Sequence, residues 1–233
     1  MRLHPATRTQ PGGGRPAAAG GIRPPLRRAI VLEWVSIVWM TLEGGISIAA
    51  GVAAGSLALE VFGLDSLIEI VAAAIVLWRL GVEARVEVAA GSTDSALETA
   101  AASRVAAAER LSARVVAVSL LALAVYIVIG AASTLRAHGV AHPGVWGFAV
   151  SIVAAGGMPL LSIAKQRAAR ALDSEALRED AIGNLACGLM ALIVLAGLVA
   201  QRGGLWWADP AAALVLGVFV LREGREGWER AGE

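Results

Sequence analysis

The sequence predicts an all-α membrane protein with six transmembrane helices and with both termini in the cytoplasm. Apolar residues make up 57% of the 233 residues and charged residues only 17%, whereas soluble domains usually contain about 25% charged residues. The apolar residues gather in six segments, each near the 20 residues that a helix needs to cross a bilayer. The basic residues between these segments then give the orientation.

Six spans are predicted within residues 29–222, at about 29–52, 57–78, 115–135, 145–163, 181–199 and 205–221. The preceding residues, 1–28, are rich in Arg, Pro, Gly and Ala without apolar periodicity, so we expect a disordered basic tail. The stretch 79–114 mixes alanines with charges and should extend two helices beyond the membrane. Residues 223–233 are expected to be a short cytoplasmic tail, with no second domain.

Basic residues lie before the first span, between the second and third, between the fourth and fifth, and after the sixth. The other side of the membrane has only Arg136 and Arg202. Cytoplasmic loops are enriched in Lys and Arg, so both termini should be cytoplasmic. No cleavable signal peptide is evident, because the first apolar run is as long as a full span. We therefore expect a multi-pass protein of the cell membrane.

The second predicted span contains two carboxylates, Asp65 and Glu69, in the largely apolar run GSLALEVFGLDSLIEIVAAAIVLW. A carboxylate at this depth costs roughly 3 kcal/mol even on the lenient insertion scale, and intramembrane acids are by default functional. Four residues apart, the two acids project from one helix face and can supply two oxygen ligands to a divalent ion. The alternative is a pair of carboxylates that is hydrogen-bonded to the backbone or to Ser66.

The fifth predicted span carries further candidate metal ligands. Asp180, Asn184 and Cys187 follow an i, i+4, i+7 spacing and share one helix face. Asp180 could instead cap the helix, Asn184 could join two helices by hydrogen bonds, and Cys187 could be a small buried hydrophobe. If Cys187 is a ligand, its thiolate favours zinc, cadmium or cobalt over magnesium or calcium. Asp65, Glu69, Cys187 and either Asp180 or Asn184 would make the four-ligand set that zinc prefers.

Other polar residues in or near the spans have two interpretations each. Glu43 lies in the middle of the first span and Glu33 near its start; Glu43 is either a proton relay or an interhelical hydrogen-bond partner. The basic residues from Lys165 to Arg178 are most simply determinants of topology. Asp209, followed by Pro210, fits the start of a helix and a structural role.

Three segments of the chain resemble parts of the cation diffusion facilitator family. AAGSLALEVFGLDSLIE resembles its second span, where a glycine-serine turn leads to an intramembrane D-x-x-x-D. LSIAKQRAARALDSEALREDA is similar to its link between spans four and five, and WWADPAAALV resembles the start of its sixth span. The resemblance covers about residues 32–228. It implies a six-helix transporter that exports divalent metal from the cytoplasm, usually as a homodimer and often in exchange for protons, through a site shared by spans two and five.

The chain departs from that family pattern in two respects. The usual fifth-span motif is H-x-x-x-D, and alignment on Asp180 puts Gly183 and Cys187 at those places. The usual cytoplasmic C-terminal domain is not expected here. The chain therefore resembles a short, divergent member of the family.

The leading hypothesis is a secondary transporter that exports a divalent metal of the zinc, cobalt, cadmium or iron class. The metal, most simply zinc, is then the substrate, and no cofactor is expected. Metal and protons compete for the same oxygens, which predicts coupling between them. The expected partners are metal cations, protons, the lipid bilayer and, as the resemblance implies, a second copy of the chain in a homodimer, with no nucleic acid.

Two alternatives stay open from the sequence. One is a transporter of another cation, or of protons alone, and the other is a membrane scaffold or sensor that does not transport. An enzyme is not expected, because the sequence has neither H-E-x-x-H nor G-x-S-x-G.

Overall fold

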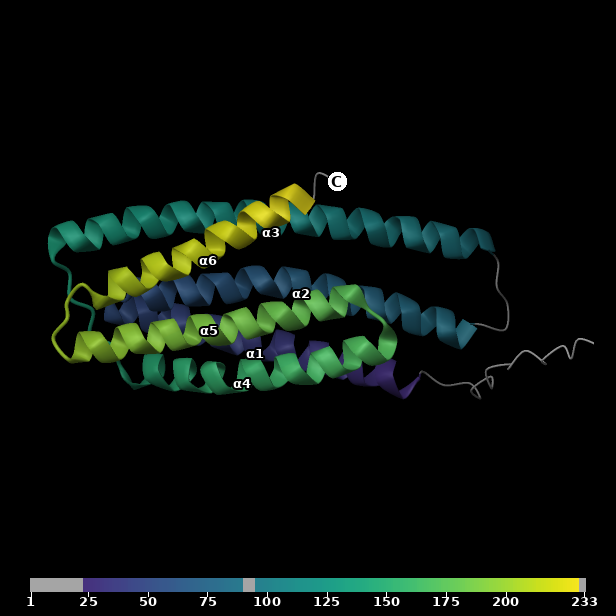
Figure 1. Cartoon of the computed structure of the whole chain (residues 1–233), viewed down its shortest axis with the longest axis horizontal. Helices are drawn as coiled ribbons and strands as arrows, with labels where there is room; N and C mark the ends of the chain where they lie inside the picture. Colours follow the sequence, from purple (N-terminus) through teal and green to yellow (C-terminus); the bar gives the residue numbers. More distant parts are fainter. Residues whose placement is uncertain (1–22, 90–94, 231–233) are drawn as a thin grey trace, which may run out of the picture.

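The computed structural model describes residues 23–89 and 95–230, with the side chains of this part except those of 85–109, 112 and 230. The described residues form six helices and no strand, as Figure 1 shows: α1 (Pro24–Ala54), α2 (Leu57–Ala89), α3 (Ser95–Ala137), α4 (Val145–Leu172), α5 (Glu175–Arg202) and α6 (Ala208–Arg230). The all-helical prediction is confirmed. The predicted disorder of the N-terminal tail falls largely on residues 1–22, which lie outside the described part.

Within the described residues, five helices, α1 to α5, are long and apolar enough to cross a membrane. The sixth, α6, is not among them, because its second half contains Arg222, Glu223, Arg225 and Glu226. At 1.5 Å per residue, its apolar part (208–221) extends about 20 Å, against about 30 Å for the hydrocarbon layer. The sixth predicted span is thus a helix whose apolar length is shorter than a full crossing.

The first helix begins earlier than predicted. Pro24 lies in the first turn of α1, where its fixed φ suits a helix and its missing N–H is not needed. Arg27 and Arg28, which the sequence predicts to be part of the tail, are therefore helical. Between the second and third spans, α2 continues to Ala89 and α3 starts at Ser95. Both helices therefore extend beyond their apolar spans, as predicted.

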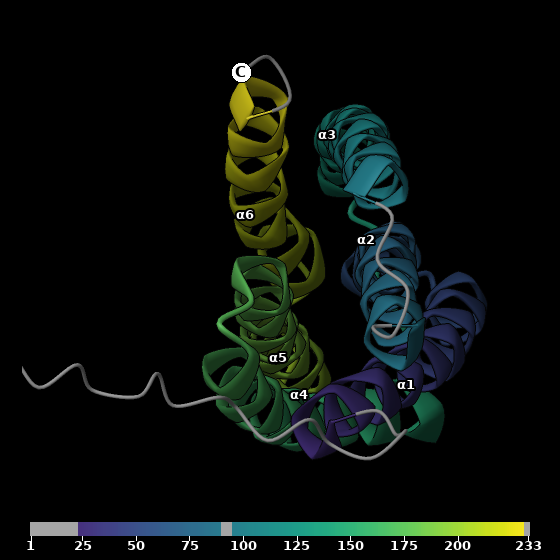
Figure 2. The ribbon, with the colours of Figure 1, turned by 90° about the vertical axis from the view of Figure 1, so that its right-hand side faces the viewer.

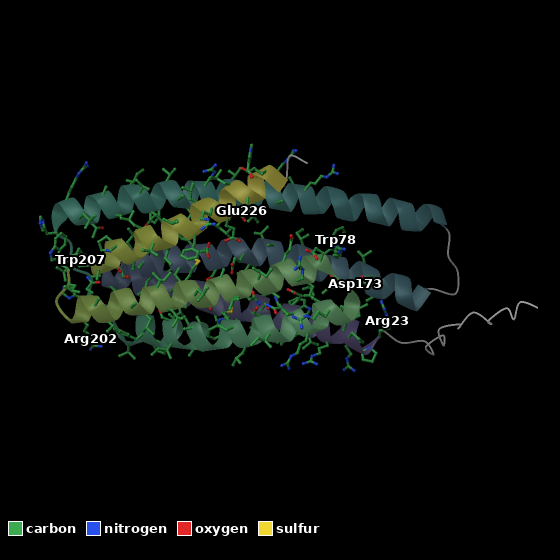
Figure 3. The ribbon with its side chains drawn as sticks, in the orientation of Figure 1. Arg23, Trp78, Asp173, Arg202, Trp207 and Glu226 are labelled. Carbon is green, nitrogen blue, oxygen red and sulfur yellow. The ribbon has the colours of Figure 1, made fainter. Side chains whose placement is uncertain are left out.

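One end of the bundle, which we call the basic end, is where α1 begins, α2 ends, α3 begins and α4 turns into α5 (Figure 1). Arg23, Trp78 and Asp173 lie toward this end, and Arg202 and Trp207 lie at the opposite end (Figure 3). The turn into α5 is capped by Ser174, whose Oγ accepts a hydrogen bond from the Leu177 N–H at 3.5 Å. Asp180 is therefore not the N-cap of this helix, and that alternative is wrong.

Asp209 fixes the opposite end of the bundle by capping a helix other than its own. Its Oδ2 accepts a hydrogen bond from the Leu57 N–H at 2.8 Å, and its Oδ1 accepts one from Ser56 Oγ at 2.5 Å. A carboxylate at a helix N-terminus satisfies an unpaired N–H and favours the helix dipole. The residue thus ties the start of α6 to the start of α2. The turn before α2 uses Gly55 at a φ of +67°, a conformation that suits glycine.

Neighbouring helices pack in the pairs α1 with α2, α4 with α5 and α3 with α6. Viewed from the basic end, α1 and α4 lie at the base, α2 and α3 rise on one side, and α5 and α6 rise on the other (Figure 2). Glycines permit the closest crossings. A Cβ at Gly63 would lie 2.8 Å from the carbonyl oxygen of Gly44, and one at Gly188 would lie 2.7 Å from Pro159 Cδ. The candidate ligands of α2 and α5 lie on the two opposite sides.

Candidate metal-binding site

A cavity of about 960 Å³ lies between the two sides of the bundle. Its lining comes from α2, α3, α5 and α6, with Met40 from α1. It reaches from Met40 and Met190, near the middle of their helices, to Arg79, Arg110 and Glu175 toward the basic end. Figure 2 shows the helices that enclose this space from the basic end. The cavity therefore connects polar side chains in the middle of the bundle with that end.

Asp65 and Glu69 lie one turn apart on α2, as predicted, and both have an unsatisfied oxygen. The side chain of Asp65 is buried, and its Oδ1 has no hydrogen-bond partner in the described structure. Glu69 is partly buried and lines the cavity, and its Oε2 also lacks a partner. Ser66 is not the partner of either acid, because its hydroxyl is directed to Glu43 Oε1 at 2.9 Å. Buried oxygens without partners are costly, so this pair is suited to a proton or a cation.

Asn184 on α5 contributes a second unsatisfied group to the same cavity. It is 1% exposed and lines the cavity, and neither its amide oxygen nor its amide nitrogen has a partner in the described structure. The interhelical hydrogen bond that was its alternative is therefore not formed. The preceding residue, Gly183, faces α2: a Cβ there would lie 3.7 Å from Glu69 Oε1. The two helices that carry the predicted ligands thus approach each other at Glu69 and Gly183, and Asn184 lines the same cavity.

Asp180 and Cys187, the other two candidates on α5, have different partners. Asp180 lines the cavity, but its Oδ2 accepts a hydrogen bond from the ammonium of Lys165 on α4. Cys187 is fully buried, and its Sγ donates to Glu43 Oε1 at 3.3 Å. Glu43 also accepts hydrogen bonds from Ser66 and from the indole N–H of Trp39. Glu43 is therefore a hydrogen-bond partner between helices, which is one of its two predicted roles.

The predicted four-ligand set is not assembled as one cluster in this structure. Within the described residues, no group of three or more His, Cys, Asp or Glu side chains is placed to hold a metal ion. Asp65, Glu69 and Asn184 are the candidates with unpaired polar atoms. Which of the five candidates bind an ion stays a prediction.

Two charged residues of this region were not singled out from the sequence as part of a site. Lys165, interpreted as a topology determinant, is fully buried. Glu223, assigned to the tail, lines the cavity from α6 and interacts electrostatically with Asp65. A helical signal for Glu223 does exist: Phe219, Glu223 and Glu226 follow an i, i+4, i+7 spacing and all line the cavity. No comparable local signal marks Lys165, since its partners are distant in sequence.

The fold and cavity define a multi-pass, all-α membrane protein with intramembrane carboxylates beside a cavity that reaches one end of the bundle. The sequence model of the cation efflux transmembrane domain matches residues 105–227, more than half of the chain. The chain belongs to this family, as its three sequence segments indicated, and it is a membrane transporter of cations of that kind. The match begins within α3, so Asp65 and Glu69 lie outside the matched residues. No curated protein matches the chain significantly.

Proposed function

We propose that this protein exports a divalent transition-metal cation from the cytoplasm in exchange for protons. The observation that carries the proposal is the unsatisfied polar atoms of Glu69 and Asn184, which line a cavity that reaches the basic end, together with the buried, unsatisfied Asp65 one helical turn from Glu69. Carboxylate and amide oxygens are hard ligands that accept divalent cations. Membership of the cation efflux family supports a cation as the substrate.

The basic end is the cytoplasmic end in this proposal, because Lys and Arg concentrate on the cytoplasmic side. The conformation described here is then open to the cytoplasm. A cation that enters past Arg79 and Arg110 reaches Glu69 on α2 and Asn184 on α5. Binding across two helices gives the ion different contacts in different arrangements of the bundle, which is the requirement for a ligand to shift a conformational equilibrium.

Proton exchange follows from the chemistry of the proposed ligands. A carboxyl group must lose its proton before it can bind the metal, so metal affinity falls as pH falls. When the bundle opens to a more acidic outer side, protonation of Asp65 and Glu69 releases the metal. The returning protein then carries protons inward, where the higher pH removes them. We propose transport by this cycle rather than an enzymatic reaction.

Zinc-class ions are the proposed substrates, with Asp65, Glu69 and Asn184 as the protein ligands. Three protein ligands leave a fourth position for water, a coordination that zinc accepts. Cys187 is hydrogen-bonded to Glu43 and fully buried, so we assign it to packing rather than to the ligand set. Asp180 is assigned to the pair with Lys165.

A second candidate function is transport of protons or of another cation by the same helices. It is favoured by Gly183, which places no imidazole beside Glu69 although the resemblance implies a histidine at that position. A site without that nitrogen ligand is less selective for zinc. The two candidates differ in whether a transition metal moves at all.

Flux into proteoliposomes distinguishes these candidates. Vesicles containing the protein and an internal metal-sensitive dye are given Zn²⁺, Co²⁺, Cd²⁺, Fe²⁺ or Mg²⁺, with an acidic lumen or with equal pH on both sides. We expect Zn²⁺ uptake that is faster with the acidic lumen, since luminal protons release the metal from its ligands. Proton flux without metal uptake above that of empty vesicles would favour the second candidate and contradict the first.

A further inference from the structure

A buried lysine joins three helices beside the cavity. Lys165 lies on α4, and its Nζ donates a hydrogen bond to Glu33 Oε2 on α1 at 3.2 Å. The same ammonium donates to Asp180 Oδ2 on α5. The side chains of Lys165 and Glu33 are 0% exposed and that of Asp180 is 8% exposed. The three residues form an internal ionic cluster that the proposed export cycle does not yet use.

The cluster contains more carboxyl groups than ammonium groups. One ammonium faces two carboxylates, and the second oxygen of Glu33, Oε1, is buried without a partner in the described structure. Replacement of Asp180 by a neutral amide would leave Lys165 and Glu33 as a balanced pair. Removal of Lys165 would instead leave two buried carboxylates without a cation, which is the strongly unfavourable case. The ammonium thus occupies the position of a bound cation.

Asp180 connects this cluster to the cavity. It lines the cavity together with Asn184, which follows it by one helical turn. An ammonium and a metal ion that approach the same carboxylate compete for its oxygens and repel each other. As long as Lys165 holds Asp180, an ion that enters the cavity meets Glu69 of α2, and Asp180 does not act as a ligand.

We propose that Lys165 is a tethered internal cation that withholds Asp180 from the metal and so limits the ligand set to Asp65, Glu69 and Asn184. This inference rests on the proposed function and specifies its selectivity. Metal affinity depends on the number of charged ligands, so a site with two carboxylates binds a divalent ion more weakly than a site with three. Weaker binding also allows protons to displace the ion more readily. Lys165 acts through Asp180 and is a positioning residue.

The test is calorimetric titration of Zn²⁺ into the purified full-length protein in lipid nanodiscs, with Asp180→Asn, Lys165→Met and the double variant. Asp180→Asn should bind Zn²⁺ within about twofold of the unmodified protein, because the Lys165–Glu33 pair stays balanced and no ligand is lost. Lys165→Met should bind about tenfold more tightly, because the released Asp180 adds a charged ligand. The double variant should return to the original affinity. If Lys165 only stabilised the fold, Lys165→Met would not increase the Zn²⁺ affinity, and the second substitution would not reverse such an increase.

Several results would overturn this inference. If Asp180→Asn loses Zn²⁺ binding as completely as Asp65→Asn does, Asp180 is a ligand in the unmodified protein. If Lys165→Met folds and binds Zn²⁺ with unchanged affinity, the lysine does not control the ligand set. If Lys165→Met does not fold, Asp180→Asn alone still decides between the two roles of Asp180. Failure of the unmodified protein to bind Zn²⁺ would overturn the proposed function itself, a result distinct from the others.

Discussion

At the scale of single residues, the buried polar atoms that lack hydrogen-bond partners distinguish the candidate ligands. Asp65, Glu69 and Asn184 have atoms without one, whereas Asp180 is held by Lys165 and Cys187 by Glu43. The first three are therefore available to an ion at little cost in existing hydrogen bonds. For Asp180 or Cys187 to coordinate a metal, an existing interaction must first be broken.

Gly183 offers a direct prediction at this scale. Its Cβ would lie at an ordinary contact distance of 3.7 Å from Glu69 Oε1, so a side chain fits there and faces the proposed site. Gly183→His should raise Zn²⁺ affinity about tenfold or more, because an imidazole nitrogen is a preferred zinc ligand. The control is Gly183→Ala, which adds a methyl group without a ligand and should leave affinity unchanged. Equal Zn²⁺ binding by the histidine and alanine variants would place the metal away from Glu69.

The candidate site residues can be predicted from the sequence only where their signals are local. The i, i+4 spacing of Asp65 and Glu69 in an apolar run is visible without a structure, and so is the shared face of Asp180, Asn184 and Cys187. The partners of Lys165 come from α1 and α5, 132 and 15 residues away in sequence. No helical periodicity encodes such pairing. The distinction between an available carboxylate and an occupied one therefore requires the packing of the helices.

At the scale of helices, hydropathy predicted their number and type but not their ends. Charged residues at the basic end continue the helices into water, so α1 starts at Pro24 and α2 runs to Ala89. The sixth helix starts at Ala208, after a turn that includes Gly204 at a φ of +95°. The capping of α2 by Asp209 spans 152 residues of sequence. From the sequence alone, Asp209 could be interpreted only as the start of its own helix, because its hydrogen-bond partner is distant in the chain.

The crossing of α1 and α2 gives a prediction at this scale. A Cβ at Gly63 would lie 2.7 Å from the Ile48 side chain and 2.8 Å from the Gly44 carbonyl oxygen, so Gly63→Ala must separate the two helices. We expect it to lower the free energy of unfolding by about 1–3 kcal/mol, the usual cost of overpacking. Gly45→Ala is the matched control, since a Cβ there meets nothing within 4 Å. It should be neutral, or stabilising by up to about 1 kcal/mol, through helix propensity.

Both values can be measured by unfolding in mixed detergent micelles. Equal stabilities for the Gly63→Ala and Gly45→Ala variants would contradict the close crossing. The result matters for the site, because this crossing positions the α2 segment that carries Asp65.

At the scale of the whole molecule, the cavity and the distribution of charge point to the same end of the bundle. The cavity reaches Arg79, Arg110 and Glu175, and most basic residues of the chain lie on that side of the predicted spans. If that end is cytoplasmic, the structure is the conformation that loads the substrate for export. Orientation therefore decides whether the cavity is an entrance or an exit.

Cysteine labelling tests this orientation. Val140, in the link between α3 and α4, and Ala171, near the end of α4, are exposed at opposite ends of the bundle. The native Cys187 is buried and should react little. In intact cells, a membrane-impermeant maleimide should label Val140→Cys, but should label Ala171→Cys only after permeabilisation. The reverse pattern would turn the cavity outward and contradict export by the proposed cycle.

Binding of the transported metal by the buried acids of α2 is the step on which the proposed export cycle depends. The most direct test is pH-driven Zn²⁺ uptake into proteoliposomes by Asp65→Asn, compared with Glu83→Gln, which removes a carboxylate of the same helix that pairs with Arg23 at the basic end. We predict that Asp65→Asn inserts and folds but carries no Zn²⁺ above empty vesicles, whereas Glu83→Gln transports at the unmodified rate. Zn²⁺ uptake by Asp65→Asn at the unmodified rate would contradict the account.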